Sequence, residues 1–272
     1  MSMTIVTVGI DLAKNVFAVH GVNQAGKPEL IRPDVRRAKL LELVVSLPPC
    51  LIGMEAYAGA HHWARQFQQL DHTVRLIAPH LVAPYRMGGK HGKNDAAAIC
   101  EAVTRPNMRF VPIKSLEQQG KLFVHRVHQG YVTHRTELIH RIRGLLSKLG
   151  IVLPKAFKQG VYQVLEDLPG YCNLVIGELL SELAHIEERV ACSQRQIQQM
   201  ARHDPQAQLL MQRAGIGPNT ASAYSATLGN GHEFKNGRQV SACAGRCWPC
   251  KTNSRSLPEQ ALSHRQETTT AA

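Results

Sequence analysis

The first 112 residues alternate short β-branched apolar runs with segments of helical composition, and this alternation constrains the fold more than any other feature of the chain. Such runs predict strands, and strands that alternate with helices indicate an α/β layer architecture. We therefore predict an α/β domain over residues 1–112. Its expected strands are 4–10, 16–19, 50–54, 74–78 and 109–111, and its expected helices are 37–46, 60–70 and 95–103.

The next region, residues 113–203, is expected to be helical. A capping box at Ser115 and Gln118 begins a helix that ends at Gly150. A second helix shows a 4-3-4-3 rhythm, which is typical of a coiled-coil seam and equally of a core helix in a bundle. A coiled coil predicts either a homo-oligomer or a long helical hairpin. The seam comprises Leu179, Leu183, Ile186, Val190, Ser193, Ile197 and Met200.

The formal net charge is +12, and most of this surplus lies in one segment. Between Arg109 and Lys158 there are ten Lys and Arg residues and only two acids. Concentrated positive charge favours a nucleic-acid partner, because neutralised phosphates release counterions; the alternative is a solvated helix face. Aromatic residues form only 5% of the chain, so we expect contacts with the nucleic-acid backbone. The candidate DNA- or RNA-binding residues are Lys121, Arg126, Arg135, Arg141, Arg143 and Lys148.

Composition argues against several classes of protein. No run approaches about 18 uninterrupted apolar residues, so we expect no membrane span. The N-terminal segment lacks the basic start of a secretory signal, and the seven scattered cysteines do not form a disulfide framework. An apolar fraction of 44% is sufficient for a core. We therefore expect a globular cytoplasmic protein.

Three carboxylates occupy positions where they can meet. Asp11 follows one predicted strand, Glu55 follows another, and Asp95 opens a predicted helix. Carboxylates at strand ends can converge on Mg²⁺ or Mn²⁺, and two such ions support phosphodiester chemistry. Taken singly, each acid is better explained as a surface charge or a helix cap, the latter above all for Asp95. Their shared placement favours a catalytic metal site formed by Asp11, Glu55 and Asp95.

A glycine pair marks a second candidate site near the C-terminus. Gly215 and Gly217 separate two expected helices within residues 209–221, as in a helix-hairpin-helix element. Glycines let backbone N–H groups approach a phosphate, and the following helix N-terminus favours an anion. The alternative is an ordinary glycine turn between two core helices. Gly215 and Gly217 are therefore further candidates for nucleic-acid contact.

Several motifs occur together in one order along residues 4–241. They are Gly9–Lys14, Gly53–Ala56, Lys93–Ala96, Ala98–Ala102, Arg105–Val111, Ile142–Leu146, Gly215–Pro218 and Phe234–Gln239. In this combination the chain resembles the insertion-sequence transposases with a RuvC-like DEDD domain, which are related to the pilin-gene invertase and include RNA-guided bridge recombinases.

The resemblance implies a RuvC/RNase H-like N-terminal domain, a partly coiled-coil helical middle and a small, mostly helical C-terminal transposase domain, here partial and confined to residues 204–241. It implies that Asp11, Glu55 and Asp95 coordinate Mg²⁺ or Mn²⁺, while a serine of the C-terminal domain forms a covalent link to DNA. The implied partners are DNA at the element ends and target, a structured guide RNA and further copies of the chain. The implied location is the bacterial nucleoid.

Two departures from the family pattern predict impaired activity. The family places a fourth acid three residues after the third, where this chain has Ala98; Glu101 would lie about 120° away around the helix from Asp95. Beyond Ser241 the family's serine and Gly-Gly-Lys turn are missing. We expect residues 242–272 to be an aberrant, disordered tail that follows a shift of reading frame. A zinc site of Cys243, Cys247, Cys250 and His264 is the alternative for this tail.

The sequence thus predicts a transposase or site-specific recombinase that moves its own insertion sequence by metal-dependent DNA cleavage and strand transfer. Two alternatives remain open from the residues. One is a structure-selective junction nuclease, and the other is a non-enzymatic nucleic-acid-binding remnant.

Overall fold

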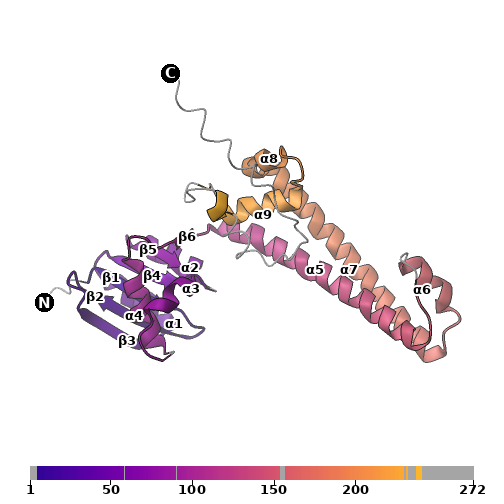
Figure 1. Ribbon diagram of the computed structural model, residues 1–272, viewed down its shortest axis with the longest axis horizontal. Coiled ribbons are helices and arrows are strands. Elements are labelled where there is room, and N and C mark those ends of the chain that lie inside the picture. The colour runs from indigo at the N-terminus through magenta and orange to yellow at the C-terminus, as the bar shows by residue number, and fades with distance from the viewer. Residues whose placement is uncertain are drawn as a thin grey trace, which may run out of the picture. The chain divides into compact units, whose positions relative to one another are not determined.

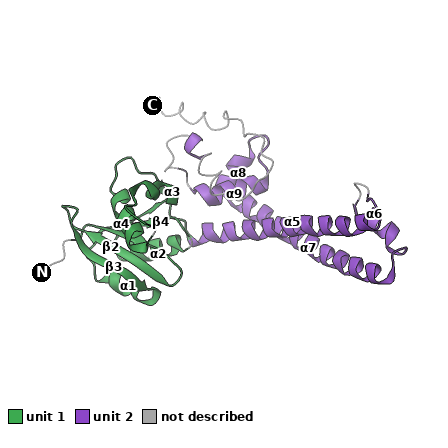
Figure 2. Cartoon of the chain, turned by 60° about the horizontal axis from the view of Figure 1, so that its bottom comes forward, with its two compact units in different colours: residues 1–115 green, residues 116–272 purple. Residues whose placement is uncertain are grey.

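The computed structural model describes residues 5–57, 59–89, 91–153, 157–229, 231 and 237–240 (Figure 1). The chain divides into two compact units, residues 1–115 and residues 116–272 (Figure 2). The division lies close to the predicted boundary at residue 112. The predicted regions 113–203 and 204–241 fall within the same second unit, because the helices that follow residue 204 pack against the long helices before it.

The first unit is built on a mixed six-stranded sheet, which confirms the predicted α/β class. Its strand order is β3-β2-β1-β4-β5-β6. The strands β1, β2 and β3 pair antiparallel, β1, β4 and β5 pair parallel, and β6 returns antiparallel to β5. The strands are β1 (Thr7–Asp11), β2 (Val16–Val22), β3 (Pro28–Arg36), β4 (Leu51–Glu55), β5 (Thr73–Ile77) and β6 (Phe110–Val111).

Strand β3 was not predicted from the sequence. It lies at the edge of the sheet, and only Leu30 and Val35 among its residues are buried. Pro33 lies where the register between β2 and β3 shifts, as expected for a proline in an edge strand. A mostly exposed strand that contains proline lacks the apolar alternation by which strands are recognised.

Helices cover both faces of this sheet. They are α1 (Arg37–Val45), α2 (Ala60–Gln68), the short α3 (Pro79–Val82) with the 3₁₀ turn η1 (Ala83–Tyr85), and α4 (Gly92–Val103). In α2 the buried residues Ala60, Trp63, Ala64 and Phe67 recur at helical spacing, so this helix buries one continuous face in the core. The predicted helix 95–103 is confirmed, but it begins about one turn earlier, at Gly92.

Two glycines bring α4 close to the sheet. A Cβ atom on Gly9 of β1 would overlap the carbonyl oxygen of Ala96, and one on Gly53 of β4 would lie 2.9 Å from Cβ of Val103. Helix α4 therefore crosses β1 and β4 at backbone-contact distance. Because Gly9 meets the middle of α4 and its register partner Gly53 meets the last turn, the helix runs across the sheet from β1 to β4.

The second unit is helical and is dominated by a long hairpin (Figure 1). Helix α5 (Leu116–Lys148) and helix α7 (Gly170–His203) lie antiparallel, and each is about 50 Å long at 1.5 Å per residue. The helix α6 (Phe157–Leu165) covers the far end of the hairpin, where Leu146, Val161 and Leu180 share one core. Helices α8 (Pro205–Met211) and α9 (Pro218–Leu228) pack at the other end.

The predicted seam of α7 packs within the chain. Leu183, Ser193 and Ile197 are buried, whereas the remaining seam positions are partly buried. The partner of this face is α5. Of the two arrangements that the heptad rhythm left open, the structure has the long helical hairpin, and a coiled coil between copies stays a prediction. Within the described ranges, no helix is both long and apolar enough to cross a membrane.

Candidate metal and nucleic-acid sites

Asp11 and Glu55 lie at the same edge of the sheet. Residues Ile10 and Met54 pair directly between the parallel strands β1 and β4, and Asp11 and Glu55 are the last residues of these two strands. Parallel strands end at one edge, so the two carboxylate-bearing residues are neighbours by register. Both are partly buried. The sequence prediction that these acids share one edge is consistent with this register.

The first turn of α4 lies against this edge. An ideal Cβ placed on Gly92 would lie 3.4 Å from Oδ2 of Asp11, so the helix begins beside that carboxylate. A helix N-terminus carries partial positive charge, which stabilises a nearby anion. Asp95 lies within the first turn, where its backbone N–H donates to the carbonyl oxygen of His91 over 3.0 Å. The residue is 8% exposed.

The carboxylate of Asp95 is engaged by an arginine. Nε of Arg86, the residue that follows η1, donates to Oδ1 of Asp95. The side chains of Arg86 and Asp95 are 26% and 11% exposed, so this ion pair is partly shielded from solvent. The partner of Asp95 is thus an internal guanidinium.

The fit of a divalent cation can be judged from these residues. Asp11 and Glu55 carry the oxygen ligands that Mg²⁺ and Mn²⁺ prefer. In the described part of the chain, however, no three His, Cys, Asp or Glu residues are grouped so that they could hold a metal ion. Carboxylate oxygens are the type of ligand that these metals prefer, and two of the three candidate residues, Asp11 and Glu55, lie at the carboxyl edge of the sheet. The third, Asp95, has Oδ1 engaged by Arg86.

The structure also places the residues that depart from the family pattern. Ala98 is 2% exposed and packs with Ile77 and Val82. Glu101 is exposed on another face of α4, where it forms an ion pair with Arg105. Glu101 therefore points away from Asp95, as its helical spacing predicts.

The candidate DNA-binding residues of α5 differ in their surroundings. Arg126, Arg141 and Lys148 are exposed, and Arg135 is partly buried. The guanidinium of Arg143 lies 5.6 Å from the ring centroid of Phe157, in the geometry of a cation–π contact. Arg126 and Arg141 are therefore the arginines of the set most open to a phosphate.

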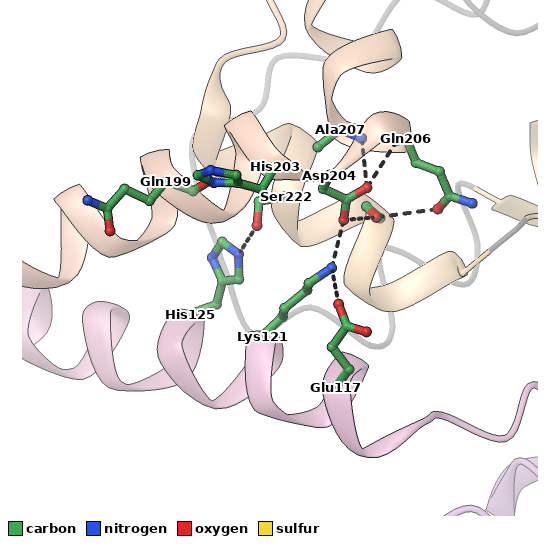
Figure 3. Close-up of polar contacts among 10 residues, drawn as sticks. Glu117, Lys121, His125, Gln199, His203, Asp204, Gln206, Ala207 and Ser222 are labelled. Atoms are coloured by element: carbon green, nitrogen blue, oxygen red, sulfur yellow. Dashed lines mark hydrogen bonds and ion pairs between the residues drawn. The ribbon is translucent and has the colours of Figure 1, made fainter.

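Lys121 lies in a polar network at the base of the hairpin (Figure 3). Its Nζ is 2.9 Å from Oδ2 of Asp204 and 3.0 Å from Oε1 of Glu117. Asp204 also accepts from the Ser225 hydroxyl over 2.7 Å and from two backbone N–H groups at the start of α8. The network lines a pocket of about 430 Å³. Lys121 therefore links α5 to α8 and α9, and its role in nucleic-acid binding stays a prediction.

Two histidines of α5 extend this polar face. Nε2 of His125 lies 3.0 Å from Oγ of Ser222 on α9, and Nδ1 of His128 lies 2.9 Å from Oγ of Ser193 on α7. Burial lowers the pKa of His125 to about 4, with a smaller contribution from His128. The Lys121 ammonium and the Ser225 hydroxyl outweigh burial and lower the pKa of the Asp204 carboxyl.

Comparison with known proteins shows which proteins the chain is similar to. No family model matches it. A probable family 20 transposase of Pseudomonas aeruginosa is 43% identical over 251 residues, which span 89% of this chain and 74% of that protein. The transposase for insertion sequence element IS1328 of Yersinia enterocolitica is 33% identical over 242 residues, 88% of this chain and 72% of that protein. The chain belongs to the insertion-sequence transposases.

A third relative extends the same result within this transposase family. The transposase for insertion sequence element IS1111A of Coxiella burnetii is 34% identical over 248 residues, 87% of this chain and 67% of that protein. Membership in the insertion-sequence transposases, which the sequence motifs indicated, is thereby confirmed, and the RuvC-like DEDD domain stays a prediction. It was recognised from short motifs in a fixed order, none of which is specific alone.

The glycine hairpin of this transposase has the predicted helix–turn–helix order. It lies between α8 and α9, with Gly215 at φ +84° and Gly217 as the residue before the first turn of α9. Both glycines are exposed. A left-handed φ is the conformation for which glycine is favoured, so Gly215 is required by the turn itself. Contact with a phosphate stays a prediction.

Some residues of interest were not found from the sequence, and others cannot be placed. Asp204 and Arg86 were not predicted to have a role. Asp204 could have been noticed, because an Asp followed by Pro205 is a typical start of a helix. Ser241, the zinc alternative and the whole tail 242–272 lie outside the described residues.

Proposed function

We propose that the chain is a DNA transposase that moves its own insertion sequence by metal-dependent strand cleavage and transfer. The observation that carries the proposal is the register of β1 and β4, which brings Asp11 and Glu55 to one edge beside the first turn of α4. The relatives, which are named as transposases of insertion sequence elements, support the same activity.

The first unit is proposed to have an RNase H/RuvC-like fold. Three antiparallel strands followed by parallel ones, with acids at the ends of β1 and β4, support this assignment. Asp11, Glu55 and Asp95 would hold Mg²⁺ or Mn²⁺. The ion would supply charge stabilisation at the phosphodiester and lower the pKa of a bound water. The N-terminus of α4 supports an anion at the same edge.

DNA is the proposed substrate, bound at element ends and target. The exposed Arg126 and Arg141 lie on the basic helix α5, where they are available to phosphates. A guide RNA is proposed from the family resemblance, and assembly into homo-oligomers is proposed from the heptad rhythm of α7.

We further propose that this copy is impaired in catalysis. Ala98 occupies the position of the fourth acid and is buried among apolar side chains, so no carboxylate is available there. This observation also favours a second candidate function, in which the chain binds nucleic acid without cutting it. The two candidates differ in whether the chain cleaves DNA at all.

The test is a nicking assay on duplex DNA that carries the element end, with Mg²⁺ or Mn²⁺. We expect weak cleavage by the wild-type chain, and background only for Asp11→Asn and Glu55→Gln. Glu101→Gln is the matched control, because this acid lies on α4 but is exposed and paired with Arg105. It should cut like wild type. Protein that binds the duplex but never cuts it would favour the binding function instead.

A second substrate, the four-way DNA junction, distinguishes a transposase from a structure-selective junction nuclease. Four-way junctions without element sequence should be cut no faster than a plain duplex if the chain is a transposase. If junctions were cleaved preferentially and Asp11→Asn abolished this cleavage, the proposed metal site would stand, but the substrate would be a DNA junction and not the element end.

A further inference from the structure

Three cations of α5 form a stripe along its outward face. Arg126, Arg141 and Lys148 lie within about 60° of one another around the helix, at about 100° per residue. The buried Ile142 lies about 160° away from Arg126, on the face that packs against α7. The three cationic side chains are exposed, and within the described residues none of them forms an ion pair. Their charge is therefore open to a ligand, and we call them the cation stripe.

The cations of the stripe are unevenly spaced along α5. At 1.5 Å per residue, Arg126 and Arg141 are separated by about 22 Å along the helix axis, and Arg141 and Lys148 by about 11 Å. The two intervals have a ratio of about two to one, and together they span about 33 Å. Because α5 is one uninterrupted helix from Leu116 to Lys148 (Figure 1), these intervals are set by the number of residues between the cations.

A B-form DNA duplex presents its phosphates at the same intervals. A line parallel to the duplex axis crosses the two strands in turn, with the major groove and the minor groove alternating between the crossings. The helical repeat is about 34 Å and the grooves are about 12 Å and 6 Å wide, so the crossings alternate at about 23 Å and 11 Å. The cation stripe matches three successive crossings, with the major groove between Arg126 and Arg141 and the minor groove between Arg141 and Lys148.

The surface between the cations has short side chains. Gly130 and Gly144 lie on the same outward face, and a Cβ atom on either would meet open space. Packing within the described chain therefore does not require glycine at these positions, although glycine inside a helix lowers its stability. The acid of this face, Glu137, lies between Arg126 and Arg141, where a bound duplex would present its major groove and not a strand. The face is thus shaped for close approach of a DNA backbone.

We propose that the cation stripe binds B-form duplex DNA laid along α5, with each cation on a phosphate at one of three successive strand crossings. Arg126 and Lys148 contact one strand, one helical repeat apart, and Arg141 contacts the other strand. An A-form RNA duplex has a narrow major groove and a wide minor groove, so it does not present its strands at these intervals. The inference rests on the DNA substrate of the proposed function, but it requires neither a metal ion nor cleavage.

The first test measures how DNA binding by the full chain depends on salt, in EDTA, with a labelled duplex of about 14 base pairs, which is about 48 Å long. Arg126→Gln, Arg141→Gln and Lys148→Gln should each lower the slope of log Kd against log salt by about 0.9, because each removes one phosphate contact. Arg135→Gln is the matched control, since Arg135 is partly buried and lies about 180° from Arg126 around the same helix. This variant should keep the wild-type slope. Equal losses in all four variants would reflect net charge alone and overturn the stripe.

The second test moves a cation without changing the net charge. The double variant Glu137→Arg, Arg141→Glu displaces the positive charge by about 6 Å along α5 and leaves an acid where the second strand would cross. Its salt slope should fall by at least as much as that of Arg141→Gln. If the double variant binds DNA as wild type does, the spacing of the cations has no role and the proposal is overturned. Both positions are exposed, and thermal unfolding confirms that the variant is folded.

A glycine variant tests the close approach of the duplex. Gly144→Gln should raise the melting temperature of the second unit, because glutamine favours a helix more than glycine does, and should at the same time weaken DNA binding. A structural role alone for Gly144 would not produce these opposite signs. Unchanged DNA binding by this variant would show that no duplex approaches α5 there.

An RNA duplex of the same length tests the form of the nucleic acid. Its salt slope should be lower than that of DNA by about one contact, and an equal slope would overturn the assignment to B-form DNA. The nicking assay reads the proposed function separately. Nicking that persists while the stripe variants bind DNA normally would overturn the stripe alone, whereas absent nicking with the expected slopes would refute cleavage and leave the stripe in place.

Discussion

His125 lies where α5, α7 and α9 pack together, and it bears directly on how the chain responds to acid. The residue is buried and its partner on α9 is the hydroxyl of Ser222. Burial disfavours the charged imidazolium, which is why the pKa falls to about 4 in the folded chain. In the unfolded chain a histidine titrates near 6.5.

This difference predicts a loss of stability on acidification. Between these two pKa values the unfolded chain binds a proton that the folded chain does not, so the free energy of unfolding decreases as pH falls from about 6.5 to about 4. From His125 alone we expect a loss of about 2 kcal/mol between about pH 7 and pH 5. Urea denaturation of the second unit at the two pH values measures it.

A histidine elsewhere on α5 provides the control for this prediction. His125→Gln should flatten the pH dependence, whereas His140→Gln, at an exposed position of the same helix, should leave it intact. An unchanged slope in His125→Gln would assign the acid sensitivity to other groups.

Single residues also show where prediction from sequence reaches its limit. Asp11 and Glu55 could be placed at one edge because each ends an apolar run, and the parallel register follows from the α/β pattern. The Arg86–Asp95 pair could not be foreseen, because it depends on how the loop before α4 folds back. Lys121 counted as a free cation in the sequence, yet its partner Asp204 is distant in the chain.

At the scale of elements, prediction succeeded where burial is continuous and failed where it is not. Strands such as β1 and β4 are buried on both faces and read as apolar runs. The edge strand β3 is exposed over most of its length and was missed. The seam of α7 was found from its rhythm, but a heptad pattern does not say whether its partner is another chain or, as here, α5.

The basic helix α5 carries a prediction of its own. Replacing Arg126 and Arg141 together by Gln should weaken binding to duplex DNA at any sequence and reduce the slope of log Kd against log salt by about two, because two phosphate contacts are lost. Fluorescence polarisation over a salt series measures the slope. Since both side chains are exposed, the melting temperature should not change.

The matched control removes charge from the other unit. Lys27 is exposed in the turn between β2 and β3, and Lys27→Gln changes the net charge without touching α5. If this substitution reduces the slope as much per charge as the α5 substitutions do, the effect reflects net charge and the contact on α5 is refuted.

At the scale of the whole molecule, each of the two units has hydrophobic clusters of its own among the described residues. Phe67 is fully buried in the core of the first unit, and Leu183 is buried in the core of the hairpin. Each core belongs to one side of the division at residue 115. Their stabilities are therefore expected to be separable.

We predict two calorimetric transitions that respond to different substitutions. Phe67→Ala and Leu183→Ala each leave a cavity that should cost about 3–5 kcal/mol in the unit concerned. Each variant should lower one transition temperature and leave the other unchanged. A single transition that both variants shift equally would mean that the units unfold as one.

The length of the hairpin has a consequence for any DNA that lies along it. A span of about 50 Å equals about 15 steps of a duplex that rises 3.4 Å per base pair, or roughly one and a half helical turns. Points on the duplex at the two ends of the hairpin then face opposite directions. A target lengthened by half a turn between two such points would present both on the same side. If DNA lies along the hairpin, its binding would therefore depend on the helical phase of the two contact points.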